Sequence, residues 1–425
     1  MNDPDSKIDW MEKKKILVIG GGAAGFFCAV NVARINPATE VIIVEKTSKL
    51  LSKVRISGGG RCNVTHACFS IPDMLKKYPR GPQFLKKSFH HFFTTDTIDW
   101  FKERNVALHE EADGRMFPVT NSSQTIIDCL MQEANKYAVQ ILMNSEVKKI
   151  EQNENGFELL LADGRVLPAD YICIACGGYP KTSMFDWLQS TGHHFEEPVP
   201  SLFTFNMPGN AITKLMGVSV PNVQVKVIGS KLMEQGPLLI THWGMSGPAI
   251  LKLSAWGAKE FSVSGYKFSI LVNWVPAFNE NSLREFIQQY RFNSAAQKIL
   301  NRNPFQLPQR LWEFLLEQSG IVSEIRWADL PAKEQNKLIK NLCTHEFAVN
   351  GKTTFKEEFV TAGGILLSEV DPNTMMSRIT PKLFFAGEIL NVDGVTGGFN
   401  FQHAWSSGFI AAKNIAEMSL NEHAR

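Results

Sequence analysis

The first 45 residues alternate between short apolar runs and one longer apolar stretch. Residues 15–19, which are apolar after Lys15, and residues 41–44, which are all valine or isoleucine, predict two short strands. Residues 23–35, which are rich in alanine and valine, predict a helix between them, and glycines fill the turn at 20–22. This order of strand, glycine turn, helix and strand predicts a βαβ unit with two parallel strands.

Two helices and a β-rich stretch are expected next. Helical periodicity is present at about 84–104 and 123–137, whereas residues 47–66 are expected to form a loop. The β-rich stretch runs from 141 to 176, with a hairpin turn at Asp163-Gly164 and one strand over 166–176.

The pattern changes near residue 198. Short alternating strands reach about residue 233, a helix is expected to begin at 246–248, and residues 281–343 are mostly helical. An Asn350-Gly351 dipeptide predicts a hairpin turn near the end of this stretch, and a strand is expected at 359–361.

The last segment returns to the style of the opening residues. It holds a strand at 383–386, a glycine-rich loop to Gly398 and a helix at about 401–418. The two ends of the chain therefore predict one α/β domain, with residues of about 196–355 inserted into it.

Composition places the chain among globular proteins. Apolar residues make up 44% of its 425 residues and charged residues 20%, and 44 Lys and Arg against 42 Asp and Glu give a net charge of +2. This balance creates no strong attraction to nucleic acid or to an anionic membrane. No apolar run approaches the ~20 residues of a membrane-spanning helix, and residues 1–10 lack the apolar core of a secretory signal. Seven cysteines are too few for a disulfide scaffold. We therefore expect a cytoplasmic protein without a membrane partner.

The motif Gly20-x-Gly22-x-x-Gly25 lies between the first strand and the first helix. In a dinucleotide fingerprint the first glycine permits the tight turn, the second lets a pyrophosphate approach, and the third lets helix and strand pack closely. The helix N-terminus offers unpaired N–H groups to the phosphates. Glu45, at the end of the second strand, is placed to accept hydrogen bonds from an adenosine ribose and would repel a 2′-phosphate. The motif predicts a bound dinucleotide.

Two further glycine loops favour FAD over NAD. One is the strand that ends at Gly177-Gly178, and the other is the strand that ends at Gly387-Glu388 and leads into residues 393–402. Three loops that converge at strand ends suit a long dinucleotide such as FAD, and the helix after Gly398 is expected to face the flavin pyrimidine. Because there is one complete GxGxxG, NADH or NADPH is expected only as a transient electron donor.

At this point the chain resembles the BaiN-like flavoproteins, also labelled aminoacetone-oxidase-family FAD-binding enzymes, over essentially its full length. The motifs that carry the resemblance are Val18-Ile-Gly-Gly-Gly-Ala-Ala-Gly25, Ile56-Ser-Gly-Gly-Gly-Arg-Cys-Asn63, Gly114-Arg-Met-Phe-Pro118, Thr241-His-Trp-Gly-Met-Ser-Gly-Pro248, Thr361-Ala-Gly-Gly364, and Phe385-Ala-Gly-Glu388 through Gly397-Gly-Phe-Asn-Phe-Gln402. One position departs from the family, since Cys176 stands where threonine is usual. That change does not threaten FAD binding.

The resemblance implies an α/β fold with a Rossmann-like FAD-binding domain and an inserted β-rich domain that itself carries a small helical insertion. The expected bounds are 14–195 and 357–425 for the FAD-binding domain, 196–280 and 344–356 for the β-rich domain, and 281–343 for the helical insertion. It also implies FAD and the flavin-dependent reduction of an unsaturated substrate. Assigned substrates in the family range from bile-acid-like enones to uracil in ribosomal RNA.

The expected cofactor-binding residues come from the glycine loops and the strands that lead into them. They are Gly20, Gly22, Ala23, Ala24, Gly25, Glu45, Lys46, Ser57, Gly58, Gly59, Gly60, Arg61, Asn63, Val147, Ala175, Gly177, Gly178, Gly387, Glu388, Gly397, Gly398, Phe399 and Asn400. No metal site is expected.

Two residues are candidates for the acid that completes a reduction. Cys62 lies in a glycine loop beside Arg61, and this cation together with backbone N–H groups is expected to lower its pKa. His242 follows a strand and is a candidate for binding substrate or relaying a proton. The alternatives are a packed loop cysteine and a structural histidine. Cys173 and Cys176, three apart on a strand, are expected to be buried thiols rather than a redox pair.

Residues 76–93 combine cations and aromatic side chains without one acid. The set comprises Lys76, Lys77, Tyr78, Arg80, Phe84, Lys86, Lys87, Phe89, Phe92 and Phe93. Such a mixture is typical of an RNA-binding face, although an amphipathic helix with buried phenylalanines has the same pattern.

The sequence therefore predicts an FAD-dependent oxidoreductase that reduces an activated C=C bond of a small molecule. Three alternatives stay open: dihydrouridine synthesis in ribosomal RNA, an amine oxidase that uses O2, and a flavin-bound binding or assembly protein without activity. The oligomeric state is not predicted.

Overall fold

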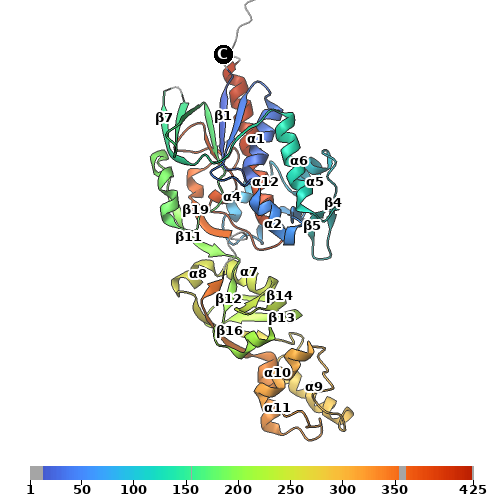
Figure 1. Cartoon of the computed structure of the whole chain (residues 1–425). Coiled ribbons are helices and arrows are strands. Elements are labelled where there is room, and N and C mark those ends of the chain that lie inside the picture. Colours follow the sequence, from blue (N-terminus) through green and yellow to red (C-terminus); the bar gives the residue numbers. More distant parts are fainter. Residues whose placement is uncertain (1–12, 155, 354–359, 424–425) are drawn as a thin grey trace, which may run out of the picture. The chain divides into compact units, whose positions relative to one another are not determined.

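The computed structural model describes residues 13–154, 156–353 and 360–423. These residues fall into two units (Figure 1). The first unit holds the chain up to Pro198 together with Gly363 onward, and the second holds Val199–Ala362. The expected boundary at 356/357 and the strand start expected at Phe359 lie outside the described residues.

A parallel sheet of five strands forms the centre of the first unit. Its strands are β1 (Lys15–Ile19), β2 (Glu40–Val44), β6 (Gln140–Leu142), β10 (Tyr171–Ile174) and β20 (Leu383–Phe385), in the order β20-β10-β1-β2-β6. All four neighbouring pairs are parallel, and Ile19 of β1 lies opposite both Val44 and Ile174. The sheet therefore joins both ends of the sequence, and the carboxyl ends of its strands meet at one edge.

Two long helices pack against each other beside this sheet (Figure 1). They are α1 (Ala23–Ile35) and α12 (Phe399–His423). A Cβ atom at Gly408 of α12 would lie 2.8 Å from the carbonyl oxygen of Ala24 in α1, so glycine permits the helices to approach this closely.

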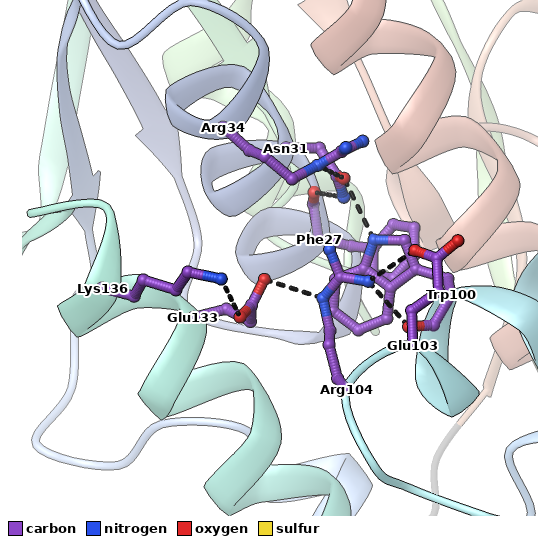
Figure 2. Close-up of polar contacts among 8 residues, drawn as sticks. All are labelled: Phe27, Asn31, Arg34, Trp100, Glu103, Arg104, Glu133 and Lys136. Atoms are coloured by element: carbon purple, nitrogen blue, oxygen red, sulfur yellow. Dashed lines mark hydrogen bonds and ion pairs between the residues drawn. The ribbon is translucent and has the colours of Figure 1, made fainter.

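A polar network ties α1 to α5 (Thr94–Lys102) and α6 (Ser123–Lys136) (Figure 2). Trp100 Nε1 donates a hydrogen bond to Asn31 Oδ1 at 3.1 Å, and the guanidinium of Arg104 lies 3.7 Å from the centre of the Trp100 ring. Arg104 Nε donates to Glu133 Oε2 at 2.7 Å. Because Glu133 is buried, this charge pair compensates its loss of water and fixes the two outer helices on α1.

Smaller elements make up the rest of the first unit, together with one strand pair whose strands continue into the second unit. They are the sheets β3 (Thr65–His66), β4 (Leu108–Glu110) and β5 (Arg115–Pro118), and β7 (Val147–Asn153), β8 (Gly156–Leu161) and β9 (Val166–Ala169), the pair β11 (Phe195–Ser201) and β19 (Val360–Ile365), the helices α2 (Ser52–Gly60), α3 (Ile71–Leu75) and α4 (Pro82–Ser88), and the 3-10 turns η1 (Thr182–Thr191), η3 (Leu367–Glu369) and η4 (Gly387–Ile389).

Three expectations for the first unit are wrong. The helix expected at 84–104 is two helices, α4 and α5, because the N–H of Phe93 binds Asp96 Oδ2 at 2.7 Å and starts a new helix. The strand expected at 166–176 is split into β9 and β10 at Asp170, whose carboxylate binds Lys14 Nζ and the N–H of Lys15. The expected loop at 47–66 contains α2.

The second unit is built on an antiparallel sheet of seven strands. They are β12 (Thr204–Asn206), β13 (Ser219–Val227), β14 (Met233–Ile240), β15 (Gly244–Ser246), β16 (Lys267–Asn273), β17 (His345–Asn350) and β18 (Lys352–Thr353), in the order β17-β16-β13-β14-β15-β12-β18. The helices are α7 (Pro248–Trp256), α8 (Ala258–Val263), α9 (Glu280–Asn293), α10 (Gln309–Ser319) and α11 (Ala332–Cys343), with the 3-10 turn η2 (Ala211–Leu215). One hydrophobic core runs through sheet and helices, with Trp274, Trp312 and Trp327 fully buried.

The hairpin expected at Asn350-Gly351 is absent. β17 pairs with β16, whereas β18 pairs with β12 at the other end of the strand order. The N–H of Gly351 donates to the carbonyl of Tyr266, and the carbonyl of Gly351 accepts the N–H of Asn206. Gly351 (φ 100°) is therefore a kink between two strand partners rather than a turn.

Candidate functional site

The three glycines of the β1–α1 turn have different environments. A Cβ at Gly20 (φ +112°) would lie 2.5 Å from the carbonyl oxygen of Ala175, and one at Gly25 would lie 1.9 Å from that of Gly20. A Cβ at Gly22 would meet nothing within 4 Å, and the backbone there (φ −94°) suits any residue. The fold itself therefore requires Gly20 and Gly25, whereas Gly22 borders open space at the N-terminus of α1, before Ala23 and Ala24.

Glu45 follows β2 and turns back to the glycine turn. Its Oε2 accepts the N–H of Gly21 at 2.8 Å, and its Oε1 accepts both the N–H and the hydroxyl of Thr47 at 2.8 Å. The carbonyl of Glu45 accepts the N–H of Ser145, two residues before the buried Val147 at the start of β7. The carboxylate is therefore held in one position at the carboxyl edge of the sheet. Beside it, Lys46 is exposed, with Nζ 5.7 Å from the centre of the Tyr179 ring.

The ends of β10 and β20 lie next to this turn. Ala175 is buried, while Gly177 (φ 78°) and Gly178 are half-buried, and a Cβ at Gly177 would lie 4.0 Å from Glu388 Oε2. Glu388 also pairs with Lys53 of α2, with Nζ and Oε2 2.5 Å apart. Gly387 packs on Ala24, since a Cβ added at Gly387 would lie 2.8 Å from the Cβ of Ala24. The structure therefore brings together the strand-end residues that the sequence selects.

The glycine run after Ser57 forms an open left-handed loop. Ser57 (ψ 148°) leaves the helical conformation, and Gly58, Gly59 and Gly60 all have positive φ. A Cβ at Gly58 would lie 2.7 Å from the Phe117 ring, whereas Cβ atoms at Gly59 and Gly60 would meet nothing within 4 Å. Two consecutive glycines therefore present exposed backbone on which a ligand can lie closely.

The expectation of a lowered Cys62 pKa is wrong. The Cys62 side chain is fully buried, and this burial raises the pKa of the thiol to about 12. Arg61 does not counter the effect, because its Nη1 binds Glu111 Oε1 at 2.6 Å and its guanidinium lies 4.0 Å from the centre of the Phe117 ring. At neutral pH Cys62 is an uncharged packing residue with a left-handed backbone (φ 61°).

The C-terminal glycine loop closes on the Ser57–Asn63 loop. A Cβ at Gly398 (φ 93°) would lie 2.5 Å from the carbonyl oxygen of Thr65, so only glycine fits. In its better orientation the Asn63 amide accepts the N–H of Gly398 and donates to the Thr65 carbonyl, both at 2.9 Å. Asn400 accepts the N–H of Gly394 and donates to its carbonyl, and therefore fixes the loop from within. Phe399 is buried at the start of α12.

Residues 77–81 support this loop. Tyr78 donates to the carbonyl of Phe399 at 2.7 Å, the carbonyl of Lys77 accepts the N–H of Val395, and Arg80 forms a bidentate ion pair with the buried Asp393. The aromatic side chains of 76–93 are buried, so they are not available to stack on bases. Their burial agrees with the alternative interpretation, an amphipathic segment with buried phenylalanines. The exposed side chains include all four lysines of this segment, Lys76, Lys77, Lys86 and Lys87.

Sequence reasoning missed His66 and Gln402. His66 Nδ1 lies 3.1 Å from the carbonyl oxygen of Gly397, its ring packs on Phe399, and burial lowers its pKa. The buried Gln402 Oε1 accepts the hydroxyls of Thr65 and Thr97. His66 lies three residues after Asn63, but no local pattern marks it as a neighbour of residue 397.

His242 lies in the second unit, exposed in the turn between β14 and β15. The Cys173 thiol is buried on β10 as expected, whereas Cys176 follows that strand and is only half-buried. All seven cysteines, which lie within the described residues, are free. Within those residues no group of three His, Cys, Asp or Glu side chains is arranged for a metal ion. The described helices include none with the length and apolarity to cross a membrane.

These features fit a long dinucleotide. Gly22 offers the space that a pyrophosphate needs next to the N-terminus of α1. The carboxylate of Glu45, just after β2, is fixed by its hydrogen bond from Gly21. Gly59 and Gly60 offer open backbone near the start of α12, since their loop is bonded to Gly398 through Asn63. A family model described as the HI0933-like protein Rossmann domain matches residues 14–414.

The chain belongs to this family. It is 31% identical over 415 residues to a protein of Escherichia coli named ribosomal RNA dihydrouridine synthase, with 95% of this chain and 98% of that protein covered. It is 26% identical over 414 residues to a 3-dehydro-bile acid delta(4,6)-reductase of Clostridium scindens, with 95% and 99% covered. The resemblance to BaiN-like flavoproteins is thereby supported at the level of the family.

Solved structures support the fold. The open conformation of a flavocytochrome c3 fumarate reductase has a TM-score of 0.51 at 17% identity and covers 96% of this chain and 79% of its own. A 3-ketosteroid delta1-dehydrogenase from Sterolibacterium denitrificans has a TM-score of 0.51 at 12% identity, with 96% and 100% covered. The predicted Rossmann-like FAD-binding fold is confirmed. The class of FAD-dependent oxidoreductases is confirmed by the family and by its relative named as a reductase.

Proposed function

We propose that this enzyme reduces the C5=C6 bond of uracil in ribosomal RNA and so makes dihydrouridine. The observation that carries the proposal is full-length similarity to two proteins that bear the name ribosomal RNA dihydrouridine synthase, from Escherichia coli at 31% identity and Haemophilus influenzae at 29%. Both alignments cover 98% of the relative, so the same set of domains is present in each.

The residues proposed to hold FAD lie along the carboxyl edge of the parallel sheet. The N–H groups at the start of α1 would bind the pyrophosphate over Gly22, and Glu45 would bind the ribose. The backbone of Ser57–Gly60 and the start of α12 after Gly398 would hold the isoalloxazine. When bound, FAD supplies hydride transfer to an electron-poor C=C bond.

The chain's own contribution is orientation and electrostatics. The N-terminal end of α12 carries a partial positive charge, which would stabilise negative charge on a reduced flavin. Glu388, held by Lys53, fixes the turn after β20. His242 is kept as a proposed substrate-contacting residue, since its ring is exposed. Cys62 is not kept as the acid, because its thiol is buried.

The electron donor is proposed to be NADH or NADPH, bound only while it reduces the flavin. The sequence has a single complete GxGxxG, and that motif is assigned to FAD here. The proposed location is the cytoplasm, where ribosomal RNA and nicotinamide nucleotides are both present.

Reduction of a small planar enone is the second candidate. The relative named 3-dehydro-bile acid delta(4,6)-reductase favours it, with 26% identity over nearly the full length of both chains. The chemistry is the same, since both reactions reduce a C=C bond that is polarised by a carbonyl group.

One anaerobic experiment separates the two candidates. Purified holoprotein is first reduced with NADH and, separately, with NADPH, and the bleaching of the flavin identifies the donor. The reduced protein then receives ribosomal RNA from a strain that lacks the gene, or a steroid enone. We expect fast reoxidation and dihydrouridine only with the RNA. If the enone reoxidises the flavin and the RNA does not, the second candidate replaces the first.

A further inference from the structure

The turn between β14 and β15 presents two aromatic rings to solvent on a fixed backbone. The Trp243 side chain is 44% exposed, and the rings of His242 and Trp243 lie in contact, with centroids 4.2 Å apart. Thr241 Oγ1 accepts the N–H groups of Trp243 and Gly244, and the Trp243 carbonyl accepts the N–H of Met207. The turn is thus braced while its largest apolar side chain remains exposed.

Glycine at position 244 makes this arrangement possible. A Cβ there would lie 2.2 Å from the carbonyl oxygen of Phe205, and the backbone has φ +152°. The turn is therefore pressed against β12, so the exposure of Trp243 is a feature of a packed turn rather than of a loose loop.

Two cations lie at the same end of the sheet. The N–H of Gly217, just after η2, donates to the carbonyl of Ile240, which immediately precedes the turn. Arg310 of α10 donates to the carbonyls of Lys214 and Met216, at 2.7 and 3.2 Å, so its guanidinium is held beside the exposed Lys214 side chain. We call Lys214, Met216, His242, Trp243 and Arg310 the turn surface.

The charge of the second unit fits an anionic partner. Residues 199–362 contain 17 Lys and Arg against 12 Asp and Glu, whereas the rest of the chain contains 27 against 30. The near-neutral total therefore conceals a basic unit and an acidic one. An exposed indole together with cations is the arrangement that binds single-stranded nucleic acid through stacking and phosphate contacts.

We propose that the turn surface binds a single-stranded segment of RNA, with a base stacked on Trp243 and phosphates bound by Lys214 and Arg310. This inference rests on the proposed function and deepens it, because it assigns substrate recognition to the second unit. The cation–aromatic segment at 76–93 does not serve this purpose, since its aromatic rings are buried.

The test is a fluorescence-anisotropy titration of holoprotein with a labelled single-stranded RNA of about 12 nucleotides. Trp243→Ala should weaken binding about 5- to 150-fold, and Trp243→Phe should restore most of it, because phenylalanine also stacks. Lys214→Gln combined with Arg310→Gln should lower the slope of log affinity against log salt by about 1.4.

Two matched controls lie elsewhere. Trp256→Ala removes a tryptophan of the same unit that is 38% exposed, and Lys86→Gln with Lys87→Gln removes two exposed lysines of the first unit. Both should bind the RNA as the wild type does. Flavin content and thermal unfolding check that every variant is folded.

Equal affinities for Trp243→Ala and Trp256→Ala would overturn the proposal, and so would a wild type that does not bind the RNA. A raised KM of Trp243→Ala for a planar enone, with RNA binding intact, would assign the turn to a small substrate instead. Failure of this inference can be told apart from failure of the proposed function, which is judged by dihydrouridine in cellular ribosomal RNA.

Discussion

Glu45 accepts a hydrogen bond from the N–H of Gly21, with the two atoms 2.8 Å apart, and so joins the end of β2 to the glycine turn after β1. The same carboxylate holds Thr47 through its other oxygen. Its position is set by the chain before any ligand arrives. A site whose carboxylate is already oriented loses less entropy when a ribose binds.

Glu45→Ala should weaken FAD binding by about 10- to 150-fold, because a hydrogen bond to a charged group contributes ~1.5–3 kcal/mol. The flavin absorption spectrum should not change, since the proposed contact is to the ribose and not to the ring. Equilibrium titration of the apoprotein with FAD measures the affinity. Glu45→Gln keeps an oxygen acceptor and should lose less. A large spectral change in Glu45→Ala would show that this carboxylate lies near the flavin ring.

Gly22→Val and Gly25→Ala should fail in different ways. The valine side chain in Gly22→Val would point into open space, and the backbone angles at this position suit valine, so the apoprotein should fold. It should lose FAD binding, because the side chain would fill the space proposed for the pyrophosphate. Gly25→Ala would place a Cβ 1.9 Å from the carbonyl oxygen of Gly20, so the protein itself should be destabilised. Circular-dichroism melting of both apoproteins separates the two effects. A Gly22→Val protein that retains FAD would remove the glycine turn from the cofactor site.

Cys62 should react slowly with alkylating reagents. Its thiol is fully buried and its pKa is raised to about 12, so thiolate is scarce at about pH 8. Peptide mapping after iodoacetamide treatment of the native protein should find Cys68 and Cys176, which are partly exposed, labelled before Cys62. Cys62→Ser should retain most of the turnover. Rapid labelling of Cys62, or loss of turnover in Cys62→Ser, would restore it as the candidate acid.

His403 should make the first unit less stable in mild acid. Burial lowers its pKa to about 4, below the ordinary value of 6.5, so the folded state keeps the ring neutral. The stability that comes from keeping this ring neutral is fully present above pH ~6.5 and is lost as the pH falls towards ~4. In that range His403 takes up a proton in the unfolded chain but not in the folded protein, so protonation favours unfolding. The loss is on the order of 3 kcal/mol.

Urea unfolding of the wild type and of His403→Gln, above and below this range, measures the effect. The variant should show a flatter dependence of the unfolding free energy on pH. The dependence that remains would include His345 of the second unit, whose pKa burial also lowers to about 4. Identical pH profiles for the two proteins would contradict the assignment.

The first βαβ unit follows from the sequence, because its signals are local. The helix expected at 23–35 is Ala23–Ile35 in the structure, and the strand expected at 15–19 is Lys15–Ile19. The break at Asp170 could not be predicted, since it depends on Lys14 and Lys15, which are more than 150 residues away.

The candidate site was predictable where glycines mark it. Positive φ angles at Gly58, Gly59 and Gly60 are a property that sequence reveals. The chemistry of Cys62 was not predictable, because sequence places it beside Arg61, whereas the fold pairs that cation with Glu111 and buries the thiol. Burial depends on the packing of distant segments, and it outweighs the adjacent charge.

The central claim is tested most directly by mapping dihydrouridine in ribosomal RNA. The RNA is isolated from a strain without the gene and from the same strain complemented with wild type or with Gly22→Val, and the modified bases are located by mass spectrometry. The account predicts that the deletion removes dihydrouridine from a defined site, that the wild type restores it and that Gly22→Val does not. An unchanged dihydrouridine map in the deletion strain would contradict it.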